Sequence, residues 1–259
     1  MRSSERLADV LVVLPTLGQR VETLRETLES IDQQRNDVSL RLIVVVPRDA
    51  AEARELLSEF DAVIVDDPGT GMSQAINDGI AARAGEKYYA WMGDDDLFRP
   101  HGLQRLVELL EGHPGAPVAY GGCDYIDESG RILGRSRAGN LAQDILAWGP
   151  DLIPHPGSMI RIFELEAVGF YAPHLKFAMD LDVFLRLKRR GRFVSTRESV
   201  SAFRWHKSSL TVANRNLSSA ESERVKQSYY PKGLRAISFI WVFPVRWASN
   251  FMARVVSAR

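Results

Sequence analysis

Three consecutive carboxylates are the side chains of this sequence best suited to chemistry. Asp94, Asp95 and Asp96 follow the apolar, aromatic run at residues 88–92, and Pro100 closes the segment. Carboxylate oxygens are hard ligands that suit Mg²⁺ or Mn²⁺, and such an ion can hold the phosphates of a nucleotide. The alternative is a solvated acidic turn before a helix that begins near Pro100, because Asp is common in turns and at helix N-caps.

The residues around this triplet predict the sheet that positions it. Apolar strands are expected at residues 9–14, 40–46, 62–65 and 88–92, and apolar residues recur at helical spacing in the segments between them. This alternation is typical of an α/β fold with a largely parallel, mixed sheet flanked by helices. Because ligands bind beyond the carboxyl ends of such strands, Pro15-Thr16-Leu17 and the acidic triplet are expected to share one cleft.

Composition excludes several classes of function. The chain of 259 residues is 45% hydrophobic, which is enough for a full core, and its 33 Lys and Arg balance its 33 Asp and Glu. With no basic excess, binding to a nucleic acid backbone is not expected. A single cysteine, Cys123, excludes an internal disulfide and a multi-cysteine zinc site, and a core or semi-buried thiol is expected there.

The two ends of the chain bear on its location. Residues 1–7 carry charges and no apolar leader, so a cytoplasmic location is expected. Residues 224–259 contain five Arg and two Lys but no acid, and the apolar run at 237–243 is cut by Pro244. That run is shorter than the roughly 18 residues that a membrane span needs.

We therefore predict a basic amphipathic helical tail at residues 224–259 that contacts the inner face of a membrane peripherally. A helix packed on the body, or a dimer interface, is the alternative. Residues 1–223 are predicted to form one catalytic domain, with a donor-binding half at about 1–100 and an acceptor half at about 101–223.

Several motifs together resemble a known family. They are Leu14-Pro15-Thr16-Leu17, the stretch 71–79 that contains Asn77, Asp94-Asp95-Asp96 with Pro100, His155-Pro156-Gly157-Ser158, Asp180-Leu181-Asp182 with Phe184-Leu185-Arg186, and Arg204-Trp205-His206-Lys207. In this order they resemble the inverting family 2 glycosyltransferases of GT-A fold, over the chain up to about Thr211. The resemblance implies a GT-A type Rossmann-like sheet and an enzyme that uses a nucleotide-diphosphate sugar.

The resemblance also implies roles for individual residues. Asp95 and Asp94 would bind Mn²⁺ or Mg²⁺, and His206 could add a ligand. The residues implied in binding the nucleotide sugar are Pro15, Thr16, Leu17, Arg20, Asn77, Asp94 and Asp95.

Inverting transfer needs a base that takes the proton of the acceptor hydroxyl, and Asp180 is the predicted base. It stands at a predicted helix start, where an N-cap role is the alternative, and Asp182 is the fallback. Asp96, His155 and Asp182 are placed on the acceptor side.

Three departures from the family pattern affect these expectations. Gly93 stands where the family often has an acid, and Met179 stands where a Glu usually precedes the base. The second strand ends in Val46-Pro47-Arg48-Asp49 in place of an acidic turn that reads uracil. The donor base is therefore left open among uridine, guanosine and thymidine.

The sequence predicts a metal-dependent inverting hexosyltransferase-like enzyme that acts on a glycan or lipid-linked acceptor, such as a surface-polysaccharide precursor. A sugar-phosphate nucleotidyltransferase should carry a Gly-rich phosphate loop with Arg and Lys after the first strand, and residues 15–20 are not that loop. The non-enzyme alternative is a degenerate member of the family that binds a nucleotide or anchors partners at a membrane.

Overall fold

Uninterrupted apolar runs form the central strands. In β1 (Val10–Pro15) every residue is buried, and β2 (Leu40–Val46) has one residue, Arg41, that is less than fully buried. The computed structural model describes residues 8–136, 139–205 and 215–230. Within them, β1 lies between β2 and β4 (Tyr88–Trp91) and is parallel to both, while β3 (Val63–Asp66) is parallel to β2 at the edge.

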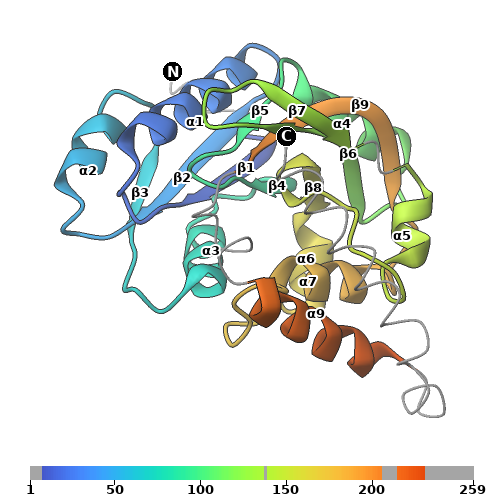
Figure 1. Cartoon of the computed structure of the whole chain (residues 1–259). Coiled ribbons are helices and arrows are strands. Elements are labelled where there is room, and N and C mark those ends of the chain that lie inside the picture. Colours follow the sequence, from blue (N-terminus) through green and yellow to red (C-terminus); the bar gives the residue numbers. More distant parts are fainter. Residues whose placement is uncertain (1–7, 137–138, 206–214, 231–259) are drawn as a thin grey trace.

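The sheet continues from β4 into a mixed half. Its full order is β3-β2-β1-β4-β8-β6-β9-β5, with β7 paired to β6. The strand bounds are β5 (Leu97–Phe98), β6 (Val118–Ile126), β7 (Ile132–Ser136), β8 (Ser158–Arg161) and β9 (Val194–Arg204). Because β8 is antiparallel to both β4 and β6, the strand direction changes beside the acidic triplet. The predicted fold class, a largely parallel mixed sheet flanked by helices, is confirmed (Figure 1).

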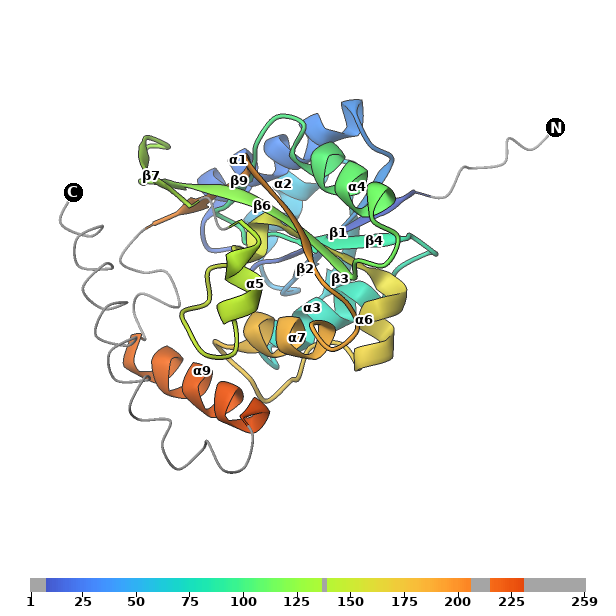
Figure 2. The ribbon, with the colours of Figure 1, turned by 90° about the vertical axis from the view of Figure 1, so that its right-hand side faces the viewer.

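Helices cover both faces of this sheet. Their bounds are α1 (Val21–Gln33), α2 (Ala51–Leu57), α3 (Met72–Ala81), α4 (Gly102–Gly112), α5 (Leu141–Ile145), α6 (Ile162–Val168), α7 (Met179–Leu187) and α9 (Arg215–Tyr229), with short 3₁₀ turns at Gln34–Asn36 and His155–Gly157. In Figures 1 and 2, α9 lies on the lower side of the molecule next to α7.

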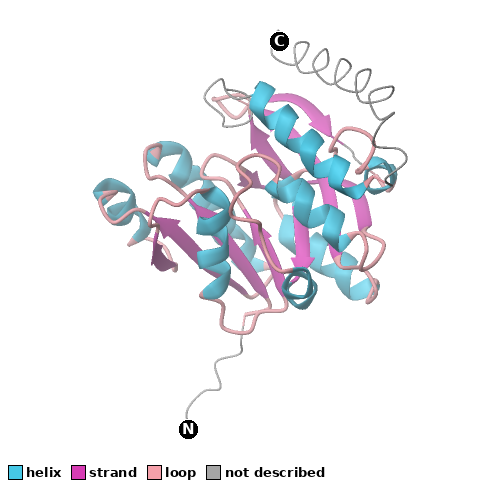
Figure 3. Cartoon of the chain, turned by 90° about the horizontal axis from the view of Figure 1, so that it is seen from below, coloured by secondary structure: helices cyan, strands magenta, loops and turns pink. Residues whose placement is uncertain are grey.

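Side-chain alternation along β1 divides the core into two layers. Val10, Val12 and Leu14 pack with α1, α2 and α4, whereas Leu11 and Val13 pack with α3, α6 and α7. This is the period of two that a strand imposes on its side chains. Seen from below, helices of the second layer lie in front of the strands (Figure 3).

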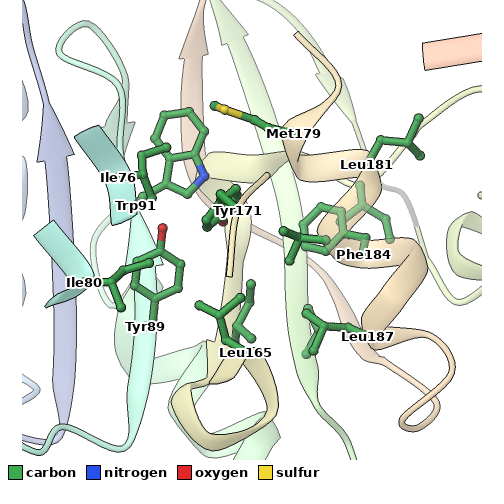
Figure 4. Packing of buried hydrophobic residues seen from close by; sticks show 14 of the residues in the cluster. Ile76, Ile80, Tyr89, Trp91, Leu165, Tyr171, Met179, Leu181, Phe184 and Leu187 are labelled. Carbon is green, nitrogen blue, oxygen red and sulfur yellow. The ribbon is translucent and has the colours of Figure 1, made fainter. Parts of the chain in front are cut away.

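The second layer is where the two halves of the chain meet. Figure 4 shows Tyr89 and Trp91 of β4 beside Ile76 and Ile80 of α3, in one cluster with Phe184 of α7. The helix that carries the predicted base therefore packs through the same core as the strand that carries the acidic triplet. The thiol of Cys123 is fully buried, as the sequence predicts.

The described part of the tail is continuous with the body. α9 runs across residue 223, so the predicted boundary between domain and tail falls inside a helix. Across the three described stretches, no helix is long and apolar enough to cross a membrane. The apolar run at 237–243 lies outside the described residues, and its contact with a membrane stays a prediction.

Candidate active site

The acidic triplet lies where β4 ends, directly beside the end of β1. The hydroxyl of Thr16 donates a buried hydrogen bond of 2.6 Å to Oδ2 of Asp94, which ties the two strand ends together. A side chain at Gly93 would place its Cβ 3.2 Å from carboxylate oxygens of both Asp95 and Asp96. The absence of an acid at Gly93 thus fits the tight packing of the triplet against itself.

Two of the three carboxylates converge on one guanidinium. Arg20, at the start of α1, donates from its two terminal nitrogens to Oδ1 of Asp94 and to Oδ2 of Asp95, each at 2.5 Å. Burial raises the pKa of Asp94, and the bonds from Thr16 and Arg20 oppose that rise. The positive charge of Arg20 offsets the repulsion between the carboxylates of Asp94 and Asp95, which lie close together.

Asp96 turns away from this pair toward the acceptor half. Its side chain is buried and accepts a bond of 3.0 Å from the backbone nitrogen of Arg204, and its Oδ2 lies 3.6 Å from Nε2 of His155. Arg204 is also buried, and its Nε donates to the backbone oxygen of Asp95 at 3.0 Å. The end of β9 therefore fixes the backbone of the triplet, a role that the sequence did not assign to Arg204.

Asp180 is the second residue of α7, in agreement with the helix start predicted there. The indole nitrogen of Trp91 donates to Oδ1 of Asp180 at 3.0 Å, and the Trp91 ring stacks on His155 with centroids 4.2 Å apart. The side chain of Asp180 is half-buried and lines a cavity. Burial raises the pKa of Asp180, and the charge of His155 and the bond from Trp91 oppose this rise.

A cavity of about 300 Å³ brings the carboxylates of both halves together. Such a volume is at the lower end of those that hold small ligands. Its lining includes the predicted site residues Pro15, Arg20, Asp94, Asp95, Asp96, His155 and Asp180, together with Trp91, Asp151, Lys176, Phe203, and Ser218 and Ser222 of α9. The cleft expected from the strand ends is thus present.

Four other predicted site residues, Thr16, Leu17, Asn77 and Asp182, are not among the residues that line this cavity. Leu17 is 59% exposed, and Thr16 is hydrogen-bonded to Asp94. The amide of Asn77 makes two bonds to the backbone of Tyr171, at 2.8 and 3.1 Å. Asp182 pairs with Arg186 at 2.6 Å. The roles given to these residues stay predictions.

A second, more open cavity of about 510 Å³ lies where β2 and β3 end. It is lined by Pro47, Arg48 and Asp49 of the unusual turn and by Asp66 and Asp67. Nε of Arg48 donates to Asp66 at 2.7 Å, and the Asp67 carboxylate accepts from the backbone of Gly69 as in a tight turn. The arginine that enters this turn is therefore paired with an acid of the next strand.

The carboxylate oxygens of Asp94 and Asp95 are the candidate donors to a divalent ion. Within the described stretches, no group of three or more His, Cys, Asp or Glu side chains surrounds one point. Asp94 and Asp95 each direct a hard carboxylate oxygen to the same place, which the guanidinium of Arg20 occupies in this structure. That donor set fits Mg²⁺ or Mn²⁺ bound through one or two carboxylates with substrate phosphates as further ligands. His206, the third predicted ligand, lies outside the described residues.

Sequence comparison places the chain in a known class of protein. The profile described as "Glycosyl transferase family 2" matches residues 11–174, more than half of the chain. The chain belongs to this family of inverting glycosyltransferases.

Two curated relatives match part of the chain. The "Uncharacterized glycosyltransferase MJ1057" of Methanocaldococcus jannaschii is 25% identical over 130 residues, which cover 48% of this chain and 44% of that protein. The "Uncharacterized protein y4gI" of Sinorhizobium fredii is 32% identical over 119 residues, which cover 46% of this chain and 13% of that protein. The matches thus span less than half of either relative.

Two solved structures share the fold over most of the chain. A Pyrobaculum calidifontis mannosyltransferase, PcManGT, in complex with GDP-Man and Mn²⁺ has a TM-score of 0.64 at 15% identity and covers 97% of this chain and 76% of its own. TarS 1–349 of S. aureus in complex with UDP-GlcNAc has a TM-score of 0.63 at 14% identity, and the match covers 89% of this chain and 73% of the TarS chain. At these identities the likeness establishes the GT-A type fold, and the ligands are properties of those two proteins.

Proposed function

We propose that this glycosyltransferase moves a hexose, in a metal-dependent inverting reaction, from a nucleoside-diphosphate sugar to a hydroxyl of a lipid-linked or surface-polysaccharide precursor. The observation that carries the proposal is the shared cavity, which Asp180 lines together with Asp94, Asp95 and Arg20. In-line displacement at an anomeric carbon requires a base and a diphosphate site that reach the same bound sugar.

Each residue has a defined part in this reaction. Asp180 takes the proton of the acceptor hydroxyl as its oxygen bonds to the anomeric carbon and the bond from that carbon to the diphosphate oxygen breaks. Trp91 holds the Asp180 carboxylate through the 3.0 Å bond, so that the carboxylate keeps its direction. Arg20 lies beside both carboxylates and binds the diphosphate. Mg²⁺ or Mn²⁺ held by Asp94 and Asp95 supplies charge that stabilises the leaving nucleoside diphosphate.

Two exposed leucines that adjoin cavity residues in the sequence support an acceptor with an apolar portion. Leu152 is 42% exposed and stands between Asp151 and Ile153, which both line the cavity. Leu217 is 61% exposed and precedes Ser218, which also lines it. Exposed leucines beside a polar cavity suit a sugar acceptor that is attached to a lipid. The basic tail adds attraction to an anionic membrane surface.

The test begins with binding. Melting temperatures of the purified protein are measured with UDP, GDP, dTDP and CDP and their common sugars, with and without Mn²⁺, because a specific ligand stabilises the folded state. A manganese-dependent rise with one nucleotide supports the proposal and identifies the donor base. If no nucleotide raises the melting temperature, and no nucleotide sugar is hydrolysed, the proposal is wrong and a degenerate binding protein is the better description.

A further inference from the structure

A buried carboxylate from α9 holds the backbone that leads into the base helix. Glu221 is 8% exposed, and its carboxylate accepts hydrogen bonds from three consecutive backbone nitrogens. The distances are 3.1 Å from Lys176, 2.5 Å from Phe177 and 2.8 Å from Ala178. Ala178 is the N-cap of α7, and Asp180 is two residues further along.

The charge of Glu221 suits this position. Burial alone raises the pKa of Glu221, but the three backbone donors lower it to a net value below the ordinary range for Glu. The side chain is thus ionised at neutral pH, and hydrogen bonds to an ionised acceptor are stronger than neutral ones. Consecutive backbone N–H groups at a helix start form a natural anion site, here filled by the chain itself.

Other contacts fix α9 against the same region. Nζ of Lys226 donates to the backbone oxygen of Gly149 at 2.5 Å, just before the cavity residue Asp151. The hydroxyl of Tyr229 donates to Asp182 of α7 at 3.3 Å. Ser218 and Ser222, on either side of Glu221 in sequence, line the cavity. α9 therefore forms part of the cavity wall and holds the start of α7.

We propose that Glu221 is a positioning residue for Asp180, and that α9 is the element through which the C-terminal part of the chain sets the direction of the catalytic base. The inference rests on the proposed function only for the role of Asp180. Residues 176–178 have no other side-chain carboxylate on their backbone nitrogens among the bonds that the described residues make. Without Glu221, the segment before α7 loses three bonds at once, and the Asp180 carboxylate loses its fixed distance from the acceptor.

The test compares Glu221→Ala and Glu221→Gln with the control Glu223→Gln in the full chain. Glu223 lies on the same helix, and its carboxylate accepts a bond of 3.3 Å from Gln227 of α9. We expect kcat to fall about 10- to 100-fold in Glu221→Ala, because small misplacements of catalytic groups cost that much. Glu221→Gln keeps one acceptor oxygen and should lose less, and Glu223→Gln should match the wild type. The donor KM and the nucleotide affinity should stay within about twofold, since the hydrogen bonds of Glu221 go to residues 176–178 and not to Arg20, Asp94 or Asp95.

Amide hydrogen exchange supplies a readout that does not depend on turnover. Exchange at residues 176–178 should become faster in both Glu221 variants and stay unchanged in Glu223→Gln. In Glu221→Ala these amides lose their acceptor, and in Glu221→Gln they keep only a neutral and therefore weaker one. Unchanged exchange in Glu221→Gln and Glu221→Ala overturns the inference, as does an unchanged kcat. A parallel loss of kcat and of nucleotide affinity also overturns it, because that result means general disruption. If the wild type transfers no sugar, the proposed function fails, while exchange still decides whether Glu221 holds this segment.

Discussion

The indole nitrogen of Trp91 donates a 3.0 Å hydrogen bond to Oδ1 of Asp180, a residue 89 positions further along the chain. Trp91 ends the strand that leads to the acidic triplet, and Asp180 lies in the first turn of the helix that packs against that strand through the second core layer. One side chain thus connects the two halves of the site. The same indole ring stacks on His155, whose Nε2 lies 3.6 Å from Asp96.

This contact predicts the pH dependence of transfer. Burial raises the pKa of Asp180 above the ordinary value for Asp, which is about 3.9. A base must be deprotonated, so kcat should fall as the pH drops through this raised pKa, at a higher pH than an exposed Asp would give. Trp91→Phe removes a bond that favours the charged carboxylate, so the acidic limb should move to still higher pH.

The measurement is a kcat profile from pH 4 to 8 for the wild type, Trp91→Phe and the matched control Trp148→Phe. Trp148 stacks on Tyr230 and does not line the cavity. The control should leave the acidic limb in place. If the acidic limb of the kcat profile in Trp91→Phe is unchanged or moves to lower pH, the role given to the indole is contradicted.

Replacing the base itself should separate binding from chemistry. Asp180→Asn keeps the size of the side chain and removes its basicity, so kcat should fall at least about 100-fold, the usual contribution of a general base. The manganese-dependent rise in melting temperature with the donor nucleotide should persist. Asp182→Asn is the matched control, because Asp182 pairs with Arg186 outside the cavity wall. Near-normal turnover in Asp180→Asn, with a loss in Asp182→Asn, moves the base to Asp182.

The acidic pair should control metal-dependent binding. Asp95→Asn halves the charge that faces Arg20 and removes a hard ligand, so the nucleotide should no longer raise the melting temperature more in Mn²⁺ than without it. The fold should remain intact, because Asp95 lies beside the cavity and outside both core clusters. Asp144→Asn, at an exposed pair with Lys188, is the control. An unchanged manganese effect in Asp95→Asn excludes this residue as a ligand.

The sequence predicted the part of the site that depends on regular, continuous patterns. β1, β2 and β4 are apolar on both faces, so their positions and the acidic residues that follow them could be located. β9 carries polar and charged residues over much of its length, and it pairs with residues of β6 that lie 75 to 78 positions earlier in the chain. The motif Arg204-Trp205-His206-Lys207 at its end resembles the family, but nothing local in the sequence indicates that Arg204 binds the backbone and side chain of the triplet.

α9 illustrates the same limit. Its sequence is mostly polar, and few of its residues are buried. The clearest feature of the sequence there is the change in charge at residue 224, which led to a predicted boundary inside the helix. Glu221 acts through backbone nitrogens of residues 43 to 45 positions earlier, and no spacing rule connects them. The missing acid at Met179 was visible in sequence, whereas the carboxylate that reaches this helix start from α9 was not.

The tail supplies the last prediction. Removal of all residues after Tyr230 keeps the contacts of Lys226 and Tyr229 with the body and deletes only the segment beyond α9. That segment contains Lys232, Arg235, Arg246, Arg254 and Arg259 and no acid. Each basic residue near an anionic surface contributes about 1 kcal/mol, so the shortened chain should pellet far less with vesicles that contain anionic lipid. Vesicles of neutral lipid should separate the contribution of charge from that of the apolar run at 237–243. Equal pelleting of the two chains on anionic vesicles rules out the tail as a membrane contact, and the alternatives are then a tail packed on the body or on a second copy of the chain.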